Sequence, residues 1–243
     1  MEALQRIDEE GVTILRLNRP AQRNAMDSGL LEAMLAQLAD ITGSSDGATR
    51  VLVFSTTSET ALSAGADVSE VLDETGGVRR MALFTQLYSA VEAFPLPTIA
   101  VCVGNVVGAG AELAAGCDLR VGGHNLKLAW AGARHGVPVG PARLVPLIGL
   151  SRAKDLIYTG RVVGAEEAER IGLTHRTAPA GQAEAVALEL ARTLAQAQPE
   201  GLRRLKSMFS ELGGSAARVE LENDLLNEFQ RTGPGLPSAP ANR

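Results

Sequence analysis

Two loops of small residues in this sequence are suited to bind an oxygen atom that gains negative charge. The first spans residues 63–67 and the second spans residues 104–110, and each follows an apolar, strand-like segment. A strand that passes through a glycine-rich turn into a helix exposes backbone N–H groups that have no partner. Convergence of the two loops would pair one amide from each as an oxyanion hole, which stabilises charge that appears in a transition state.

One acidic residue, Glu112, lies a helical turn beyond the second loop, with apolar neighbours on both sides. A carboxylate in such a helix is partly desolvated, and it is a candidate general base or acid. Two simpler interpretations remain open. A glutamate in the first turn of a helix often only stabilises the helix dipole, and glycines after a strand often only form a turn.

Other chemistries are less well supported by the residue pattern. The dinucleotide-binding fingerprint needs a small residue at position 113, where this chain has Leu113, and it normally sits in the first βα unit. A nucleotide-dependent oxidoreductase is therefore disfavoured. The three histidines and two cysteines show no ligand spacing, so no metal site is predicted.

The composition indicates a globular protein with an aliphatic core. The 243 residues are 45% hydrophobic and 21% charged, and the net charge of −5 argues against a nucleic-acid partner. The most apolar stretch, residues 99–116, contains Asn105 and Glu112, so we expect buried core and not a membrane span. No apolar leader precedes the charged opening, which predicts a cytoplasmic protein with reduced thiols at Cys102 and Cys117.

Strand and helix patterns alternate along most of the chain, which favours an α/β fold. We expect a core over residues 1–195, a C-terminal helical region over 196–231 and a disordered tail over 232–243, which is rich in proline, glycine and serine. The predicted strands are 12–17, 51–55, 98–103, 118–121 and 126–130. The predicted helices are 27–43, 78–93, 109–116, 151–159, 165–171, 183–196, 201–212 and 216–229.

Four segments in order carry a resemblance to a known family. They are Asn-Arg-Pro-Ala-Gln-Arg-Asn-Ala-Met at 18–26, Ala-Leu-Ser-Ala-Gly-Ala-Asp at 61–67, the run from Pro97 to Asp118, and the run from Tyr158 to Leu173. Together they resemble the crotonase, or enoyl-CoA hydratase/isomerase, superfamily. The resemblance implies a spiral of ββα units with a helical C-terminal region, assembled as a homotrimer or hexamer, that acts on acyl-CoA thioesters such as those of fatty acid metabolism.

The resemblance also assigns roles to individual residues. It implies that the backbone amides of Ala66 and Ala109 polarise the thioester carbonyl, although the family usually has glycine where this chain has Ala109. Arg23 and Ala64 match positions that meet the nucleotide end of coenzyme A, and Gly108 matches the substrate-binding turn. Coenzyme A enters as part of the substrate, so no separate cofactor is implied.

One position departs from the hydratase pattern, which has two glutamates twenty residues apart. Glu112 matches the first, but Gly132 occupies the second, so ordinary hydration lacks an acid/base partner. Trp130 and His135 lie in the same segment and are candidates to contact the acyl substrate. His135 would titrate near neutral pH, although a solvent-facing loop histidine and a core tryptophan are the simpler interpretations.

Two hypotheses follow from the sequence. The first is an acyl-CoA thioester-transforming enzyme of the enoyl-CoA hydratase/isomerase type, a lyase or isomerase in which an oxyanion hole stabilises an enolate and Glu112 moves the proton. The alternative is a catalytically impaired homologue that binds acyl-CoA, motivated by Gly132 and by a proline-rich tail where the family usually has a closing helix.

Overall fold

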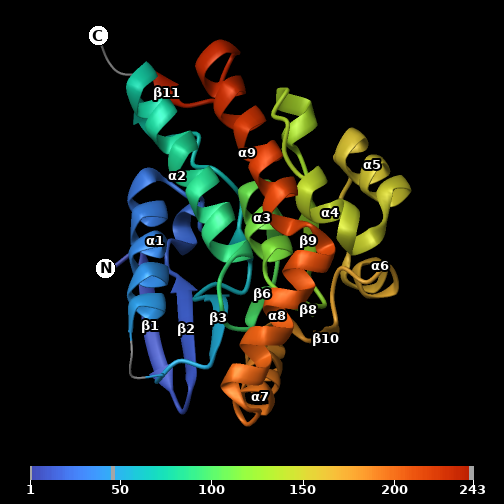
Figure 1. Cartoon of the computed structure of the whole chain (residues 1–243). Helices are drawn as coiled ribbons and strands as arrows, with labels where there is room; N and C mark the ends of the chain where they lie inside the picture. The colour runs from blue at the N-terminus through green and yellow to red at the C-terminus, as the bar shows by residue number, and fades with distance from the viewer. Residues whose placement is uncertain (1, 45–46, 241–243) are drawn as a thin grey trace.

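The chain folds as a spiral in which strands of two sheets alternate with helices. The structure is a computed structural model that describes residues 2–44 and 47–240. Figure 1 shows α1 and α2 in front of the strands, α9 crossing α2, and α7 at the lower end. Three successive segments, β3–β4–α2, β6–β7–α3 and β8–β9–α4, each supply one strand to a main sheet, one to a second sheet, and then a helix. The predicted ββα spiral is therefore confirmed.

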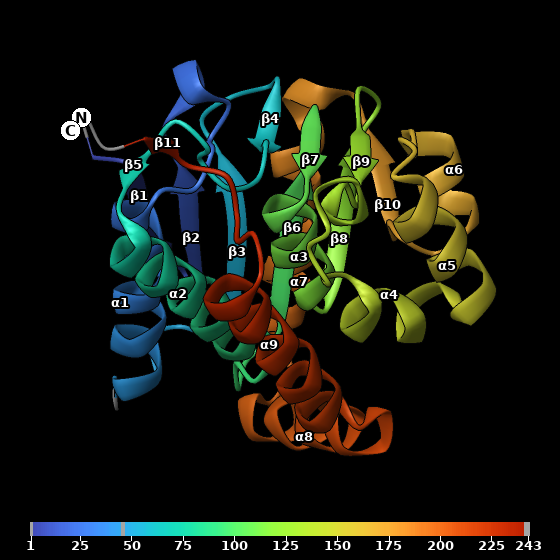
Figure 2. The ribbon, with the colours of Figure 1, turned by 90° about the horizontal axis from the view of Figure 1, so that it is seen from above.

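The strands form three sheets in the described residues, and Figure 2 shows the main sheet in the order β1-β2-β3-β6-β8-β10. Neighbours are parallel except for β1 and β2, which form an antiparallel hairpin. The main-sheet strands are β1 (Leu4–Glu9), β2 (Val12–Leu17), β3 (Val51–Thr56), β6 (Thr98–Cys102), β8 (Leu119–Gly123) and β10 (Arg176–Ala178). The second sheet joins β4 (Ala61–Ser63), β7 (Asn105–Val107) and β9 (Lys127–Ala129), and the third pairs β5 (Val71–Leu72) with β11 (Ala239–Pro240).

The helices cover both faces of the main sheet. They are α1 (Ser28–Gly43), α2 (Glu74–Glu92), α3 (Ala109–Gly116), α4 (Pro141–Ile148), α5 (Leu150–Thr159), α6 (Ala165–Arg170), α7 (Ala183–Ala195), α8 (Pro199–Gly213) and α9 (Ser215–Thr232). Short 3-10 turns span Pro20–Gln22, Gly132–His135 and Ala180–Gln182. None of the helices in the described part of the chain is long and apolar enough to cross a bilayer.

Strand β3 shows how the sheet separates two apolar cores. Val51 and Val53 pack with the alanine face of α7, whereas Leu52 and Phe54 join the larger core beneath α1, α2 and α3. All four side chains are fully buried, because successive residues of a strand point to opposite faces and helices cover both. The continuous apolar run in the sequence has this physical origin.

Several elements differ from the sequence-based expectations. The patterns missed the hairpin strand β1, the short strands β4, β7 and β10, and helix α4, which begins at Pro141 and contains Pro146. Strands of three residues leave too little periodicity to detect, and an internal proline normally argues against a helix. The expected disordered tail also differs: α9 runs to Thr232 and β11 pairs with β5, while residues 241–243 lie outside the described residues.

Candidate functional site

The two small-residue loops meet, because glycines at their contact leave no side chain between them. Gly65 has a φ of +104°, and a Cβ there would lie 3.0 Å from the carbonyl oxygen of Val107 and 3.6 Å from the amide nitrogen of Ala109. A Cβ on Gly110 would lie 2.5 Å from the carbonyl oxygen of Ser63. Larger residues at these positions would force the loops apart.

Each loop contains one backbone amide that donates no hydrogen bond to the backbone among the described residues. Ala66 is held by its neighbours, since the Met26 amide donates to the Gly65 carbonyl and the Asp67 amide donates to the Met26 carbonyl. Within the described residues, the amides of Ala66 and Ala109 donate no backbone hydrogen bond. Ala109 is the first residue of α3, where amides have no intrahelical acceptor and the helix dipole is positive.

Both alanines line one cavity of about 210 Å³. Its walls are mainly apolar and include Met81 and Phe84 of α2, with Tyr88 one turn further along that helix. A cavity that combines apolar walls with two unpaired amides suits a hydrophobic group attached to a polarised oxygen.

Glu112 does not line this cavity. Its side chain is fully buried, and both of its oxygens accept hydrogen bonds. Trp130 donates from Nε1 to Oε1 over 2.6 Å, and Arg143 donates from Nη1 to Oε2 over 2.9 Å. Burial raises the pKa of Glu112, and the contacts with Arg143 and Trp130 oppose that rise. The carboxyl expected to move a proton is therefore held within the core behind the cavity wall.

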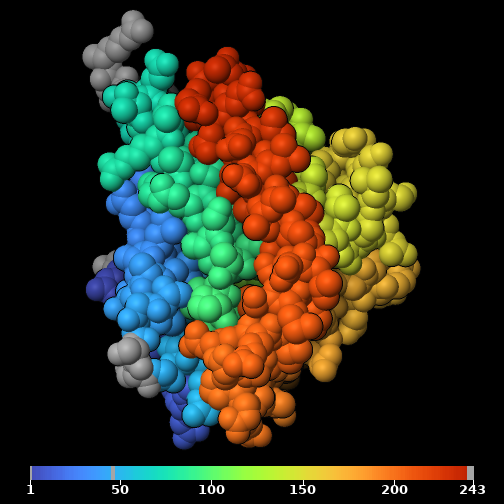
Figure 3. Space-filling model, viewed as in Figure 1, coloured from blue at the N-terminus to red at the C-terminus, as the bar shows by residue number. Residues whose placement is uncertain are grey.

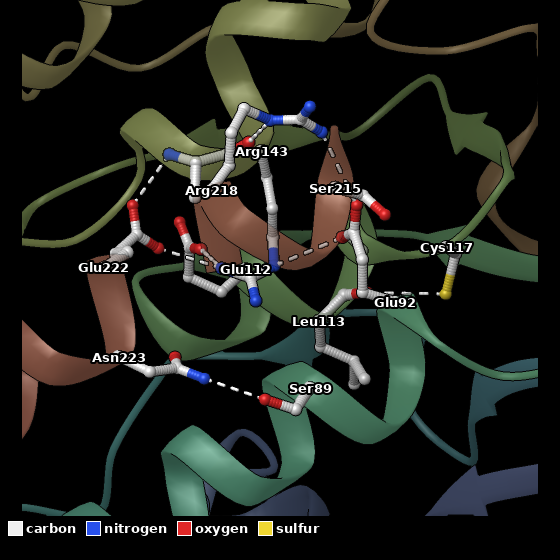
Figure 4. Close-up of polar contacts among 12 residues, drawn as sticks. Ser89, Glu92, Glu112, Leu113, Cys117, Arg143, Ser215, Arg218, Glu222 and Asn223 are labelled. Carbon is white, nitrogen blue, oxygen red and sulfur yellow. Dashed lines mark hydrogen bonds and ion pairs between the residues drawn. The ribbon is translucent and has the colours of Figure 1, made fainter. Parts of the chain in front are cut away.

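Arg143 on α4 is the centre of the polar cluster around Glu112 (Figure 4). Its Nη1 also donates to Glu222 Oε1 of α9 over 2.8 Å, and its Nε lies 3.7 Å from Glu92 Oε2 of α2. Its guanidinium carbon lies 4.8 Å from the ring centroid of Tyr88, a side chain of the cavity wall. One buried cation thus links three helices to the carboxyl of Glu112.

The sequence analysis did not identify Arg143 or Glu222. Arg143 lies among apolar residues of α4, and the two prolines of this segment argued against a helix in the sequence analysis. Glu222 lies 79 residues further along the chain, in a helix with many surface acids, and its contacts come only from the tertiary fold. The position of Arg143 within an apolar run was the one signal that could have indicated this cluster. A buried arginine needs an acidic partner, so such a residue predicts a buried ion pair.

The other residues singled out from the sequence divide into two groups. The cavity is lined by Ala64, Gly108 and the exposed His135. Arg23 is also exposed, and its carbonyl accepts a hydrogen bond from the Ala64 amide. Trp130 is buried and does not line the cavity, and its Nε1 donates a hydrogen bond to Glu112.

Comparisons with known proteins identify the family of this chain. Residues 8–233 match the family model described as enoyl-CoA hydratase/isomerase. The chain is similar to a putative enoyl-CoA hydratase of Thermus thermophilus, with 33% identity over 215 residues that cover 86% of this chain and 84% of the relative. It is also similar to the 2,3-dehydroadipyl-CoA hydratase of Escherichia coli, with 30% identity over 225 residues that cover 91% and 86%. This chain belongs to the enoyl-CoA hydratase/isomerase family.

A solved structure supports the same assignment. The enoyl-CoA hydratase from Bacillus anthracis superposes with a TM-score of 0.80 at 26% identity, covering 97% of this chain and 98% of the other. The crotonase fold expected from the four motifs is therefore confirmed for this family member.

Gly132 lines the cavity, and a side chain at this position would be crowded by two neighbouring valines. A Cβ on Gly132 would lie 2.7 Å from Val139 Cγ1 and 3.0 Å from the carbonyl oxygen of Val137. The valine methyl is stiff, because a β-branched side chain has few rotamers, and the carbonyl belongs to the backbone. The contacts with Val139 and Val137 therefore disfavour any side chain at position 132.

We expect Gly132→Ala to lower the free energy of unfolding by about 1–3 kcal/mol, as overpacking a well-filled site does. In a Val139→Ala background the same substitution should cost less, since one of the two close contacts is gone. Urea unfolding of the four proteins measures this as a double-mutant cycle. Gly164→Ala is the control, because a Cβ there meets open space at negative φ. Equal costs in both backgrounds would contradict the steric explanation.

Stability should also depend on pH through Glu222, whose Oε2 accepts hydrogen bonds from the amides of Gly140 and Ala142. Burial and the nearby Glu112 raise the pKa of Glu222 to about 8, against the opposing effect of Arg143. A carboxyl with a raised native pKa binds its proton more tightly when folded, so its contribution is full below about pH 4.5 and is lost as pH rises towards about 8.

We therefore expect the free energy of unfolding to fall less steeply over this pH range in Glu222→Gln than in the wild type, because glutamine does not ionise. Urea titrations at several pH values give the two slopes, and Glu220→Gln, which removes an exposed carboxylate from the same helix, is the control. A Glu222→Gln slope that matches the wild type would show that Glu222 does not titrate in this range.

Proposed function

We propose that this protein transforms an acyl-CoA thioester by holding the thioester oxygen with the backbone amides of Ala66 and Ala109. The observation that carries the proposal is the presence of both unpaired amides at one apolar cavity. Removal of a proton next to the thioester carbonyl moves charge onto that oxygen as an enolate forms. Two fixed N–H donors stabilise this charge without reorganising during the reaction.

In this proposal Glu112 moves the proton. Because the carboxyl of Glu112 does not line the cavity and hydrogen-bonds to Trp130 and Arg143, its side chain must turn from these partners towards the cavity before it can accept a proton from the acyl group. Arg143 favours the ionised form of Glu112 and so also lowers its basicity. We expect slow proton transfer compared with a carboxylate that faces its substrate directly.

Conventional hydration is the least suitable of the family reactions, because a water molecule needs a second acid/base group where this chain has Gly132. Double-bond isomerisation, decarboxylation and thioester hydrolysis each need an enolate or oxyanion and fewer proton-transfer groups. Coenzyme A would enter as part of the substrate, with exposed Arg23 beside Ala64 placed to meet its nucleotide end.

The amide of Ala109 can be removed with little change to the backbone. Ala109 is the first residue of α3, a position where proline is well tolerated, so Ala109→Pro deletes the N–H and keeps the helix. We expect turnover of an accepted thioester to fall about 10²–10³-fold, as for loss of one oxyanion-hole donor. Ala109→Ser, which retains the N–H, should keep most of the activity. Equal rates for both variants would refute the role of this amide.

Glu112→Gln tests the proton-transfer role on a panel of enoyl, β-keto and malonyl-type thioesters. Glutamine keeps an acceptor for Trp130 but cannot accept a proton, so we expect kcat to fall about 10²–10⁴-fold. Glu92→Gln is the matched control, since it also removes a negative charge near Arg143 without touching the carboxyl of Glu112. Unchanged turnover in Glu112→Gln would assign the proton transfer to another group.

The buried pairing of Glu112 with Arg143, together with Gly132, favours one alternative function. A family member whose first carboxylate is neutralised by a cation and whose second is absent would bind acyl-CoA without converting it. Calorimetry with acyl-CoA, run beside the turnover panel, separates the two functions. Tight binding without turnover would identify a catalytically impaired homologue.

We also propose that the protein assembles as a homotrimer or hexamer. Figure 3 shows α8 and α9 as a continuous ridge across one face of the molecule. On α8, the side chains of Phe209 and Leu212 are 71% and 82% exposed. Large apolar side chains that gather on an exposed helix are typical of association surfaces. Light scattering coupled to gel filtration measures the mass of the assembly.

A further inference from the structure

The chain that follows α9 turns back across the molecule and reaches the cavity. We call residues 233–240 the strap. Figure 1 shows it leaving α9 towards β11, and Figure 2 shows β11 beside β5, with which it pairs in parallel. The Ala239 amide donates to the Glu70 carbonyl over 3.0 Å, and the Leu236 amide donates to Gln230 Oε1 over 2.9 Å. The strap is therefore hydrogen-bonded to α9 near its middle and to the residue before β5 near its end.

A buried cation holds the middle of the strap. Arg80 of α2 is fully buried, and its Nη2 donates to the Pro237 carbonyl over 2.8 Å. Its Nη1 donates to the Asp67 carbonyl over 2.8 Å and lies 3.4 Å from Glu70 Oε2. Asp67 directly follows Ala66, so one guanidinium connects the strap to the loop that carries the first amide. Burial of an arginine costs free energy unless such partners are present, so Arg80 favours the arrangement in which the Pro237 carbonyl accepts its hydrogen bond.

The strap forms part of the cavity wall. Leu236 and Pro237 line the same cavity as Ala66 and Ala109, together with Met81 and Phe84 of α2. Leu236 is half-buried and packs against the larger core. Without the strap, this side of the cavity would open beside α2.

The volume of the cavity limits which acyl groups it can bury. A cavity of about 150 Å³ lined by apolar side chains accommodates a benzene molecule. The cavity here measures about 210 Å³, so it suits a compact or short acyl group better than a long alkyl chain.

We propose that the strap determines acyl-chain length and that Leu236 is the specificity-determining residue at the end of the acyl chamber. The protein would then select thioesters with short or compact acyl groups, and shortening Leu236 would admit longer ones. This inference rests on the proposed function, since it places the acyl group of a CoA thioester in this cavity. Leu236 acts by shape and takes no part in bond making.

The test measures dissociation constants of butanoyl-, octanoyl- and dodecanoyl-CoA by calorimetry. We expect the wild type to bind butanoyl-CoA more tightly than octanoyl-CoA. Leu236→Ala should shift the octanoyl-to-butanoyl affinity ratio about tenfold towards octanoyl-CoA, because the space it frees buries further methylene groups. Leu236→Trp should weaken binding of all three by filling the chamber. Leu150→Ala, which shortens an exposed leucine on α5, is the matched control.

The possible failures are distinguishable. A wild type that binds none of the three thioesters would overturn the proposed function and this inference with it. A wild type that binds butanoyl-CoA, combined with a Leu236→Ala ratio equal to that of Leu150→Ala, would overturn only the role of the strap. Equal affinity of the wild type for all three chain lengths would also overturn it. Circular dichroism of each variant confirms that folding is retained, which is expected because Leu236 lies outside the fully buried core.

Discussion

The structure depends on the contact between two backbone loops that have no side chains between them. Gly65 and Gly110 allow the segment after β4 to touch the segment after β7, and a Cβ on Gly110 would lie 2.5 Å from the Ser63 carbonyl. The parallel pairing of β4 with β7 brings both loops to the same edge of the second sheet. As a consequence of this contact Ala66 and Ala109 line one cavity, and their amides donate no backbone hydrogen bond among the described residues.

The helix that presents one of these amides also places a carboxylate in the core. Ala109 starts α3 and Glu112 follows within its first turn, so the position of the amide fixes where the carboxyl lies. Burial of Glu112 then requires a counter-charge, which Arg143 supplies, and Arg143 in turn contacts Glu222 of α9. The C-terminal helices are thus attached to α3 through charge as well as apolar packing.

Local residue patterns predicted the parts of the molecule that local chemistry determines. Glycine-rich loops after apolar strands indicated where unpaired amides occur, and periodicity located most helices, including α7 and α9. The partners of Glu112 could not be predicted in this way, since Arg143 and Glu222 come from helices 31 and 110 residues further along the chain. The strap shows the same limit: a proline-rich segment appears disordered until Arg80 and β5 supply its hydrogen-bond partners.

Position 132 carries no carboxylate, and Glu112 is paired with Arg143. Both features leave the cavity without a carboxylate that faces it. A water molecule held between two carboxylates needs both to face the cavity, and here Gly132 offers no side chain while Glu112 faces an arginine. The amides of Ala66 and Ala109 do not depend on this arrangement, because the glycine contact between the two loops positions them and the Glu112 cluster does not. A fold of this kind can therefore keep its backbone geometry while the acid/base side chains beside it change.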